Sequence, residues 1–312
     1  MRKVFIALTA MTLATGLASC RQGKTAESDI DAEQARLEQI SHIDTMALRA
    51  MPPDAITSSA SLDSLTADAW MLIDDSTGIV ISARNAFQRR YMASLTKMMT
   101  ALMVLEKGQL TDTVVITDDV CVYDNAYVKP GDAYVLGDLI CEMMMKSDNN
   151  AAYALAKHVA GDTLAFYDMM NSKAKYLGMD STHFANPNGM PNNDNYSSAA
   201  DLTKLARYCM RDSTFAAIVG TTGRNIPLTD GRYQKCYNGN ELIRTYEGCT
   251  GIKSGYTLQA GFCLAASATR NGTSLTLVLL NSRTSDRRFT ESAALLDYGF
   301  RMMRAYKQSA AM

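Results

Sequence analysis

The sequence predicts an α/β chain of the α+β type, with one mostly antiparallel sheet, helices packed on it and an inserted helical lobe. Three observations predict this class: strand-like runs near residue 70, a long helical block from about 94 to 210, and further strand-like runs from about 250 that lead into a terminal helix. Strands separated by a run of helices are typical of a sheet interrupted by an insertion. With 312 residues, of which 47% are hydrophobic and 20% charged, the chain has enough apolar side chains for a sizeable core.

The first two strands are predicted to form a hairpin. Residues 70–73 and 79–82 are strand-like, and the Asp-Asp-Ser-Thr-Gly run between them is a turn signal. Helices follow, because apolar residues then recur on one face, as Leu95, Met98 and Leu102 do. The expected helices span residues 94–107, 135–145, 149–159, 164–177 and 199–210. The spacing of apolar residues changes from a helical to a strand-like period near residue 244. The last elements are expected to be strands at 251–257, 261–269 and 274–280 and a helix at 290–306.

The N-terminus has the pattern of an export signal. Arg2 and Lys3 precede an uncharged, mostly apolar stretch at 4–17, which is too short to span a bilayer. The string Leu-Ala-Ser-Cys that ends at Cys20 resembles a bacterial lipobox, in which cleavage before the cysteine leaves that residue lipidated. A plain secretory signal with a chance cysteine is the alternative. The predicted organisation is a signal peptide at 1–19, a polar tether at 20–65 and a catalytic domain at 66–306.

An exported, lipid-anchored chain would lie in the bacterial cell envelope and face the periplasm. Six further cysteines are compatible either with one or two disulfides or with scattered buried thiols, and their spacing contains no C-x-x-C pair that would favour zinc. The formal net charge of −1, without a basic stripe, argues against nucleic-acid binding.

Three short motifs carry the chemistry. They are Ser94-Leu95-Thr96-Lys97, Ser147-Asp148-Asn149 and Lys253-Ser254-Gly255. Each is weak alone, but in this order they match the S-x-x-K, S-D-N and K-T-G signature of penicillin-binding proteins and class A β-lactamases.

The first motif predicts an activated serine. Ser94 and Lys97 are three residues apart on a helix, so their side chains share a face. A serine hydroxyl becomes a good nucleophile when a base removes its proton, and a lysine is such a base only when its amine is neutral. Burial and a nearby cation lower a lysine pKa, and Lys253 would be that cation if its strand lies beside the helix. Free N–H groups at the helix start would stabilise an oxyanion.

The other two motifs predict substrate contacts. Ser147 lies between two expected helices and would pass a proton to a leaving amine, while Asn149 would bind a substrate amide. Asp148 is expected to cap the following helix. Lys253 and Ser254 suit a substrate carboxylate, and Gly255 permits close approach of a substrate backbone.

Together these residues resemble the serine D-Ala-D-Ala carboxypeptidases, the low-molecular-mass penicillin-binding proteins, over roughly residues 67–300. Further matching stretches are 93–100, 131–132, 147–152, 177–179, 183–189, 196–202 and 251–257. The resemblance implies a serine β-lactamase/DD-peptidase-like fold without cofactor or metal. Met92, Asn150 and Ser254 depart from common family residues without removing a catalytic group. The additional C-terminal β domain of many members is not expected here.

The resemblance also implies roles. Ser94 would be acylated by the penultimate D-alanine of a peptidoglycan stem peptide ending in D-Ala-D-Ala, and β-lactams would be inhibitors. Lys97 would be the base and Ser147 the proton relay. The N–H groups of Ser94 and Tyr256 would form the oxyanion hole. Arg288 would help to bind the carboxylate, with Arg283 and Arg287 as competing assignments.

Five other functions can be compared with the sequence. A DD-endopeptidase would use the same active site. A class A β-lactamase needs a glutamate after the second motif, and none occurs between Glu142 and Glu241. A non-catalytic peptidoglycan-binding protein would not need Ser94, Lys97 and Lys253. The only histidines, at positions 42, 158 and 183, have neither the G-x-S-x-G context of a histidine-based hydrolase nor zinc-ligand spacing.

Overall fold

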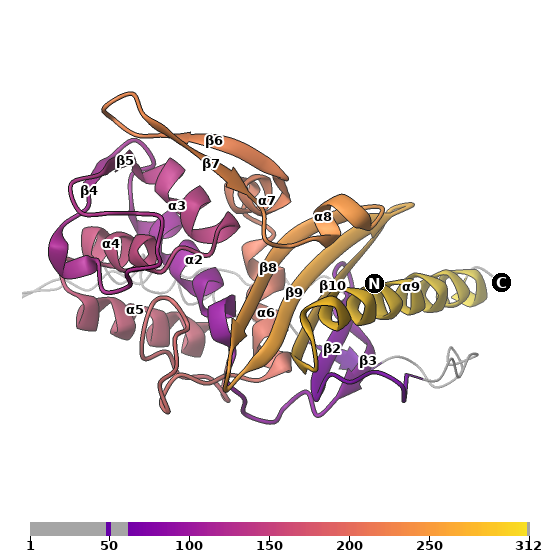
Figure 1. Cartoon of the computed structure of the whole chain (residues 1–312). Coiled ribbons are helices and arrows are strands. Elements are labelled where there is room, and N and C mark those ends of the chain that lie inside the picture. The colour runs from indigo at the N-terminus through magenta and orange to yellow at the C-terminus, as the bar shows by residue number, and fades with distance from the viewer. Residues whose placement is uncertain (1–47, 51–61, 311–312) are drawn as a thin grey trace, which may run out of the picture. The chain divides into compact units, whose positions relative to one another are not determined.

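The computed structural model describes residues 48–50 and 62–310, which belong to one compact unit. The predicted signal peptide, Cys20 and most of the predicted tether lie outside these residues. At the centre is a six-stranded sheet in the order β1-β3-β2-β10-β9-β8, antiparallel except where β1 runs parallel to β3 (Figure 1). The strands are β1 Arg49–Ala50, β2 Ala69–Asp74, β3 Ile79–Arg84, β8 Cys249–Thr257, β9 Gly261–Arg270 and β10 Thr273–Ser282.

The helices form a lobe beside β8 and a cover on the sheet (Figure 1). The 3₁₀ turn η2 leads directly into α2, and the longest helix, α9, packs on β10, β9 and β2. The helical elements are η2 Ala93–Thr96, α2 Lys97–Lys107, η3 Asp118–Val120, α3 Leu136–Met145, α4 Asn149–Ala160, α5 Thr163–Tyr176, α6 Ala199–Cys209, α7 Ser213–Gly220, α8 Leu242–Thr245 and α9 Ser285–Ala310. The antiparallel sheet with an inserted helical lobe confirms the predicted architecture.

Alternation along the strands divides the apolar residues between two cores. In β2, Met71 and Ile73 join the core shared with the helical lobe, whereas Trp70 and Leu72 join the core under α9. Successive side chains of a strand point to opposite faces, so a sheet covered on both sides gives a continuous apolar run. All six residues of β2 are accordingly buried.

Several elements differ from the sequence prediction. The expected strands and most lobe helices are found within about two residues of their predicted ends. The first expected helix, at 94–107, is preceded by η2 and begins at Lys97, and α9 spans 285–310 rather than 290–306 because its first turn is polar and shows no apolar periodicity. The short elements β1, η3, α7 and α8 and two small antiparallel sheets were missed. These sheets pair β4 Thr113–Val115 with β5 Ala133–Val135, and β6 Gly223–Pro227 with β7 Tyr233–Tyr237.

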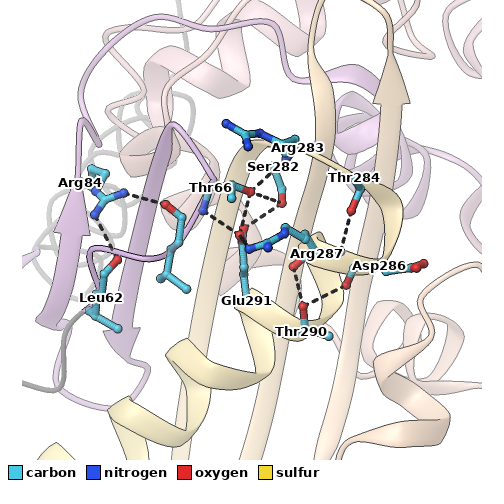
Figure 2. A network of polar contacts seen from close by, with 11 residues as sticks. Leu62, Thr66, Arg84, Ser282, Arg283, Thr284, Asp286, Arg287, Thr290 and Glu291 are labelled. Atoms are coloured by element: carbon cyan, nitrogen blue, oxygen red, sulfur yellow. Dashed lines mark hydrogen bonds and ion pairs between the residues drawn. The ribbon is translucent and has the colours of Figure 1, made fainter.

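A polar network ties residues 62–66 to the sheet and α9 (Figure 2). The Thr66 backbone N–H and hydroxyl both donate to Glu291 Oε1 at 2.7 Å, and Ser282 Oγ donates to Glu291 Oε2 at 2.8 Å. Arg84 donates to the carbonyl oxygens of Leu62 and Leu65. The last residues of the predicted tether that the structure describes therefore lie against the sheet.

Candidate active site

Ser94 lies in the 3₁₀ turn that precedes α2, one residue after a strained backbone position. Ala93 has a φ of +49°, a region that L-residues seldom adopt, and Ser94 itself is partly exposed. The sequence predicted that Ser94 would begin the α-helix; the helix instead begins at Lys97 after the turn. Strained positions such as Ala93 occur often at functional sites.

Lys97 is fully buried and has three oxygen neighbours. Its Nζ donates to Asn149 Oδ1 at 2.8 Å and to the Asn188 carbonyl oxygen at 2.7 Å, and it lies 3.1 Å from Ser94 Oγ. Burial first, and then the positive charge of Lys253, hold the pKa of the Lys97 amine well below its usual range, against a smaller opposing effect of Asp148. These are the two causes that the sequence analysis required for a neutral lysine.

The arrangement around Lys97 fits a neutral amine in a specific orientation. Such an amine has two N–H groups and one lone pair. The two oxygens that cannot donate, Asn149 Oδ1 and the Asn188 carbonyl, take up both N–H groups. The lone pair is then left for the Ser94 hydroxyl, whose O–H can donate.

The second motif joins α3 to α4. Ser147 has a φ of +64° and stands in the short connection, while Asn149 is the first residue of α4. The Asp148 side chain accepts from Ala151 N at 2.8 Å, which confirms the predicted helix cap. Asp148 Oδ2 also accepts from the backbone N–H groups of Tyr127 and Val128, so this carboxylate fixes the preceding loop as well.

The third motif lies on β8, the edge strand of the sheet that faces η2. Lys253 is 2% exposed, and burial, followed by the charge of Arg288, lowers its pKa to about 7. Its Nζ donates to the Ser254 carbonyl oxygen at 3.0 Å, and Ser254 Oγ donates to the Gly239 carbonyl oxygen at 3.3 Å. A Cβ on Gly255 would lie 2.8 Å from Ser94 N, so only glycine lets the turn that carries Ser94 pack this close to β8.

Arg288 and Tyr256 flank this strand. Arg288 Nη1 donates to the Gly255 carbonyl oxygen at 3.1 Å, and its guanidinium lies over the rings of Phe262 and Phe289. Tyr256 is half exposed, with its ring stacked on Phe262 at 4.3 Å. Of the three arginines weighed for a carboxylate contact, Arg288 is the one that reaches the third motif.

The loop at 186–190 was not assigned a role from the sequence. Its Asn188 carbonyl oxygen is one of the two acceptors of Lys97, and the Pro187 carbonyl oxygen accepts from Thr100 Oγ1. Gly189 has a φ of +85°, and a Cβ there would lie 1.9 Å from the Ala93 carbonyl oxygen. Every residue type has a backbone carbonyl, so the sequence does not mark which one accepts from Lys97. The Asn-Pro-Asn-Gly string was the only hint in the sequence.

Comparison with known proteins identifies the chain's relatives. The family model of D-alanyl-D-alanine carboxypeptidases, the S11 peptidases, matches residues 56–284. The chain belongs to this family. Arg288 lies just beyond the matched residues, whereas the three motifs lie within them. The S11 assignment confirms the resemblance seen in the sequence.

Several S11 relatives are about 30% identical to this chain. The D-alanyl-D-alanine carboxypeptidase of Streptomyces sp. K15 is 31% identical over 272 residues, which cover 81% of this chain and 92% of that protein. DacF of Bacillus subtilis is 30% identical and DacC of Escherichia coli 32% identical, and the match covers 62% of each. The chain thus spans less than two thirds of the length of these two relatives.

Solved structures agree on the fold. The crystal structure of the Streptomyces K15 DD-transpeptidase has a TM-score of 0.73 at 30% identity, covering 76% of this chain and 98% of that one. DacD of Francisella tularensis gives a TM-score of 0.71 at 30% identity. The predicted DD-peptidase-like fold is therefore confirmed.

Two findings bear on the envelope predictions. Among the described residues, helices of membrane-spanning length and apolarity are absent. The six cysteines after Cys20 are all free thiols, which favours the second of the two alternatives left by the sequence.

Proposed function

We propose that this S11 family member is a serine D-Ala-D-Ala carboxypeptidase, which removes the terminal D-alanine from peptidoglycan stem peptides through an acyl-enzyme on Ser94. The observation that carries the proposal is the environment of Lys97, a fully buried amine that lies 3.1 Å from Ser94 Oγ, donates to Asn149 Oδ1 and the Asn188 carbonyl oxygen, and has its pKa lowered by burial and by Lys253. A non-catalytic binding protein would have no use for this costly arrangement.

Acylation begins when Ser94 Oγ attacks the carbonyl carbon of the penultimate D-alanine and its proton moves to Lys97 Nζ. The oxyanion that forms accepts hydrogen bonds from the N–H groups of Ser94 and Tyr256. The proton then passes through the Ser147 hydroxyl to the leaving nitrogen, the C–N bond breaks and D-alanine departs. Water attacks the ester carbonyl and gives its proton to Lys97. The bond between the acyl carbon and Ser94 Oγ then breaks, Lys97 returns the proton to Ser94 Oγ, and the shortened peptide leaves with a new carboxylate.

The terminal carboxylate of the substrate is assigned to Lys253 and Ser254, with Arg288 behind the strand. A cationic Lys253 attracts the carboxylate, and the Ser254 hydroxyl can turn from the Gly239 carbonyl oxygen toward it. Asn149 keeps its predicted substrate contact through its Nδ2 amide, because only its Oδ1 is used by Lys97. Gly255 offers its backbone to the peptide beside Ser94.

Two measurements test the mechanism. Mass spectrometry after incubation with penicillin should find the adduct on Ser94, and a peptide ending in D-Ala-D-Ala should release free D-alanine. Ser94→Ala should abolish both, while Ser213→Ala, which changes an exposed serine of α7, should leave both intact. Release of D-alanine by the Ser94→Ala protein at the wild-type rate would overturn the proposal.

The same acyl-enzyme would serve related reactions, which differ in the leaving group that is released and in the molecule that accepts the acyl group. A DD-endopeptidase would cleave a cross-linked dimer and release no D-alanine. Transfer to an amine, the activity named for the Streptomyces K15 protein, would give a cross-linked product. Supplying a pentapeptide, a cross-linked dimer and an amine acceptor side by side separates the three.

For the cell, we propose export by residues 1–19 and lipidation of Cys20, with the residues that follow linking the lipid to the catalytic domain in the envelope. Because Arg49 and Ala50 pair with β3 of the sheet, the free tether would end before residue 49 and not at 65. The supporting observation is the lipobox-like string that ends at Cys20. Metabolic labelling with a fatty acid should mark the wild-type protein and not Cys20→Ser. Unlabelled wild-type protein would instead favour a plain secretory signal.

A further inference from the structure

A cavity lies close to the turn that carries Ser94, and the residues that line it have not entered the contacts described so far. Its volume is about 410 Å³, and its lining includes Arg89, Tyr91, Asn193, Tyr196 and Gln259. Tyr91 stands three residues before Ser94. Gln259 lies in the turn after β8, two residues beyond the end of that strand. The cavity is therefore flanked by the two chain segments that form the proposed active site.

The geometry of β8 directs an extended substrate toward this cavity. β8 is an edge strand, so its free side can pair with a peptide. With the terminal carboxylate at Lys253 and the reacting carbonyl at Ser94 and Gly255, the rest of the peptide continues toward Gln259. From Gly255 to the end of β8 at Thr257 an extended chain spans about 7 Å, and the turn at 258–260 that carries Gln259 follows directly. The third or fourth residue from the substrate's C terminus therefore reaches the end of β8, beside this turn and the cavity.

The charge in this cavity is positive. Arg89 is exposed, its guanidinium lies 4.8 Å from the centre of the Tyr196 ring, and within the described part of the chain it has no ion-pair partner. The neighbouring Arg90 is different, because it pairs with Asp68 at 3.0 Å. Asp68 also accepts from Asn281 Nδ2, so its carboxylate is already used. The charge that remains for a ligand is that of Arg89.

We propose that this cavity is a subsite for a carboxylate carried by the third or fourth residue from the C terminus of the peptide substrate, with Arg89 as the specificity-determining residue. The Tyr196 ring holds the guanidinium in place, and Asn193 and Gln259 line the same cavity as further polar residues. The inference rests on the proposed function, since it takes its peptide direction from Ser94 and Lys253.

The test uses N-acetylated tetrapeptides that end in D-Ala-D-Ala and carry either glutamate or glutamine at the third residue from the C terminus. A second pair carries the same change at the fourth residue. The two members of a pair differ only by a carboxylate in place of a carboxamide. For the wild-type protein, KM for D-alanine release should be about fivefold lower with glutamate at one of the two positions.

Arg89→Ala should remove this preference by raising KM for the glutamate peptide to the value for its glutamine partner, and Arg89→Glu should reverse the preference. Arg301→Ala, which removes an exposed arginine of α9, is the matched control and should keep the preference. Equal KM values for glutamate and glutamine peptides at both positions would overturn the subsite. An equal loss by Arg89→Ala on both members of each pair would do the same.

A binding measurement separates this inference from the proposed function. Calorimetry with the Ser94→Ala protein needs no turnover and should show the same fivefold preference for the glutamate peptide, lost in the Ser94→Ala/Arg89→Ala double variant. If no peptide releases D-alanine but the binding preference is present, the proposed reaction fails and the subsite stands. If D-alanine is released and binding is indifferent to the carboxylate, the subsite alone is refuted.

Discussion

The buried charges of the active site and those under α9 are arranged in opposite ways. Glu291 is 4% exposed, but its carboxylate accepts from Thr66 N, Thr66 Oγ1 and Ser282 Oγ (Figure 2). Lys97 and Lys253 are equally buried, and the strongest charge acting on Lys97 is the like charge of Lys253. The carboxylate under α9 is stabilised by hydrogen bonds, whereas the protonated form of each lysine is disfavoured by burial and by a like charge, that of Lys253 for Lys97 and that of Arg288 for Lys253.

This difference separates stability from function. Breaking a satisfied buried network leaves a polar group without partners, which costs several kcal/mol. The two lysines also make hydrogen bonds, but no carboxylate among the described residues pairs with either amine, and their depressed pKa values mean that the folded state disfavours their charged forms. We therefore expect substitutions at Glu291 to lower stability with little direct effect on chemistry, and substitutions at the lysines to do the reverse.

The largest expected effect is on chemistry at Lys97. Lys97→Arg places a group there that stays protonated at any working pH, so it cannot accept the Ser94 proton. Acylation by a fluorescent penicillin should slow by about 10²- to 10⁴-fold. The control is Lys157→Arg, at a surface ion pair with Asp119, which should react normally. Rapid acylation of the Lys97→Arg protein would show that another group is the base.

The next effect is on stability at Glu291. Glu291→Ala removes the acceptor of three donors and should lower the free energy of unfolding by about 3 kcal/mol, measured by urea denaturation. Glu241→Ala, at an exposed position, should change it by less than about 0.5 kcal/mol. Because the network also holds residues 62–66, protease cleavage near Thr66 should become faster in the Glu291→Ala protein. A fully stable Glu291→Ala protein would break the distinction between the two regions.

Sequence alone predicted much of the site because its groups are side chains at short, fixed spacings. The S-x-x-K spacing predicted the Ser94–Lys97 contact, and the need for a neutral lysine predicted a nearby cation, which is Lys253. The Asn188 carbonyl could not be predicted, since every residue has one and only the path of the loop selects it. The same holds for Glu291, whose partners Thr66 and Ser282 are far away in the sequence. The β6–β7 hairpin was missed because only Ile226 and Cys236 of its two strands are buried, too few for a clear alternation.

Lys253→Met sharpens the comparison because it tests protein stability and substrate binding separately at one residue. The pKa of Lys253 is about 7 in the folded protein and near 10.5 when exposed, so between these values the unfolded chain binds the extra proton. Unfolding free energy therefore rises with pH from about 7 to 10.5, and the full cost of burying the charge is present below pH 7. At pH 6, Lys253→Met should be more stable by about 2 kcal/mol.

The same Lys253→Met protein should bind D-Ala-D-Ala peptides more weakly, because the carboxylate loses its cation. Urea denaturation at pH 6 and pH 10 gives the first quantity, and KM for D-alanine release gives the second. A variant that is both less stable and unchanged in KM would mean that Lys253 acts as a structural residue.

Glu142 gives the smallest and most discriminating test, because it is a buried charged group that belongs to neither region. Its carboxyl is buried beside the Cys236 thiol, a weak hydrogen-bond donor, and burial, with a further contribution from Asp148, raises its pKa from 4.5 to about 7 against the opposing effects of Lys146 and Cys236. Here the folded protein binds the extra proton between pH 4.5 and 7, so stability falls as pH rises through that window. Glu142→Gln should match the wild type in urea denaturation at pH 4.5 and exceed it by about 1 kcal/mol at pH 8, less than for Lys253 because the pKa shift is smaller and Lys146 opposes it.

Penicillin acylation of Glu142→Gln should be unchanged. The pKa of Lys97 depends on its burial, on Lys253 and on Asp148, and Glu142 is not among its causes. A buried charged group would then mark a catalytic residue only where it shifts the pKa of the proposed nucleophile or of its base, as Lys253 does for Lys97. Slower acylation of Glu142→Gln would instead extend the active site's electrostatic arrangement along α3 to this carboxyl.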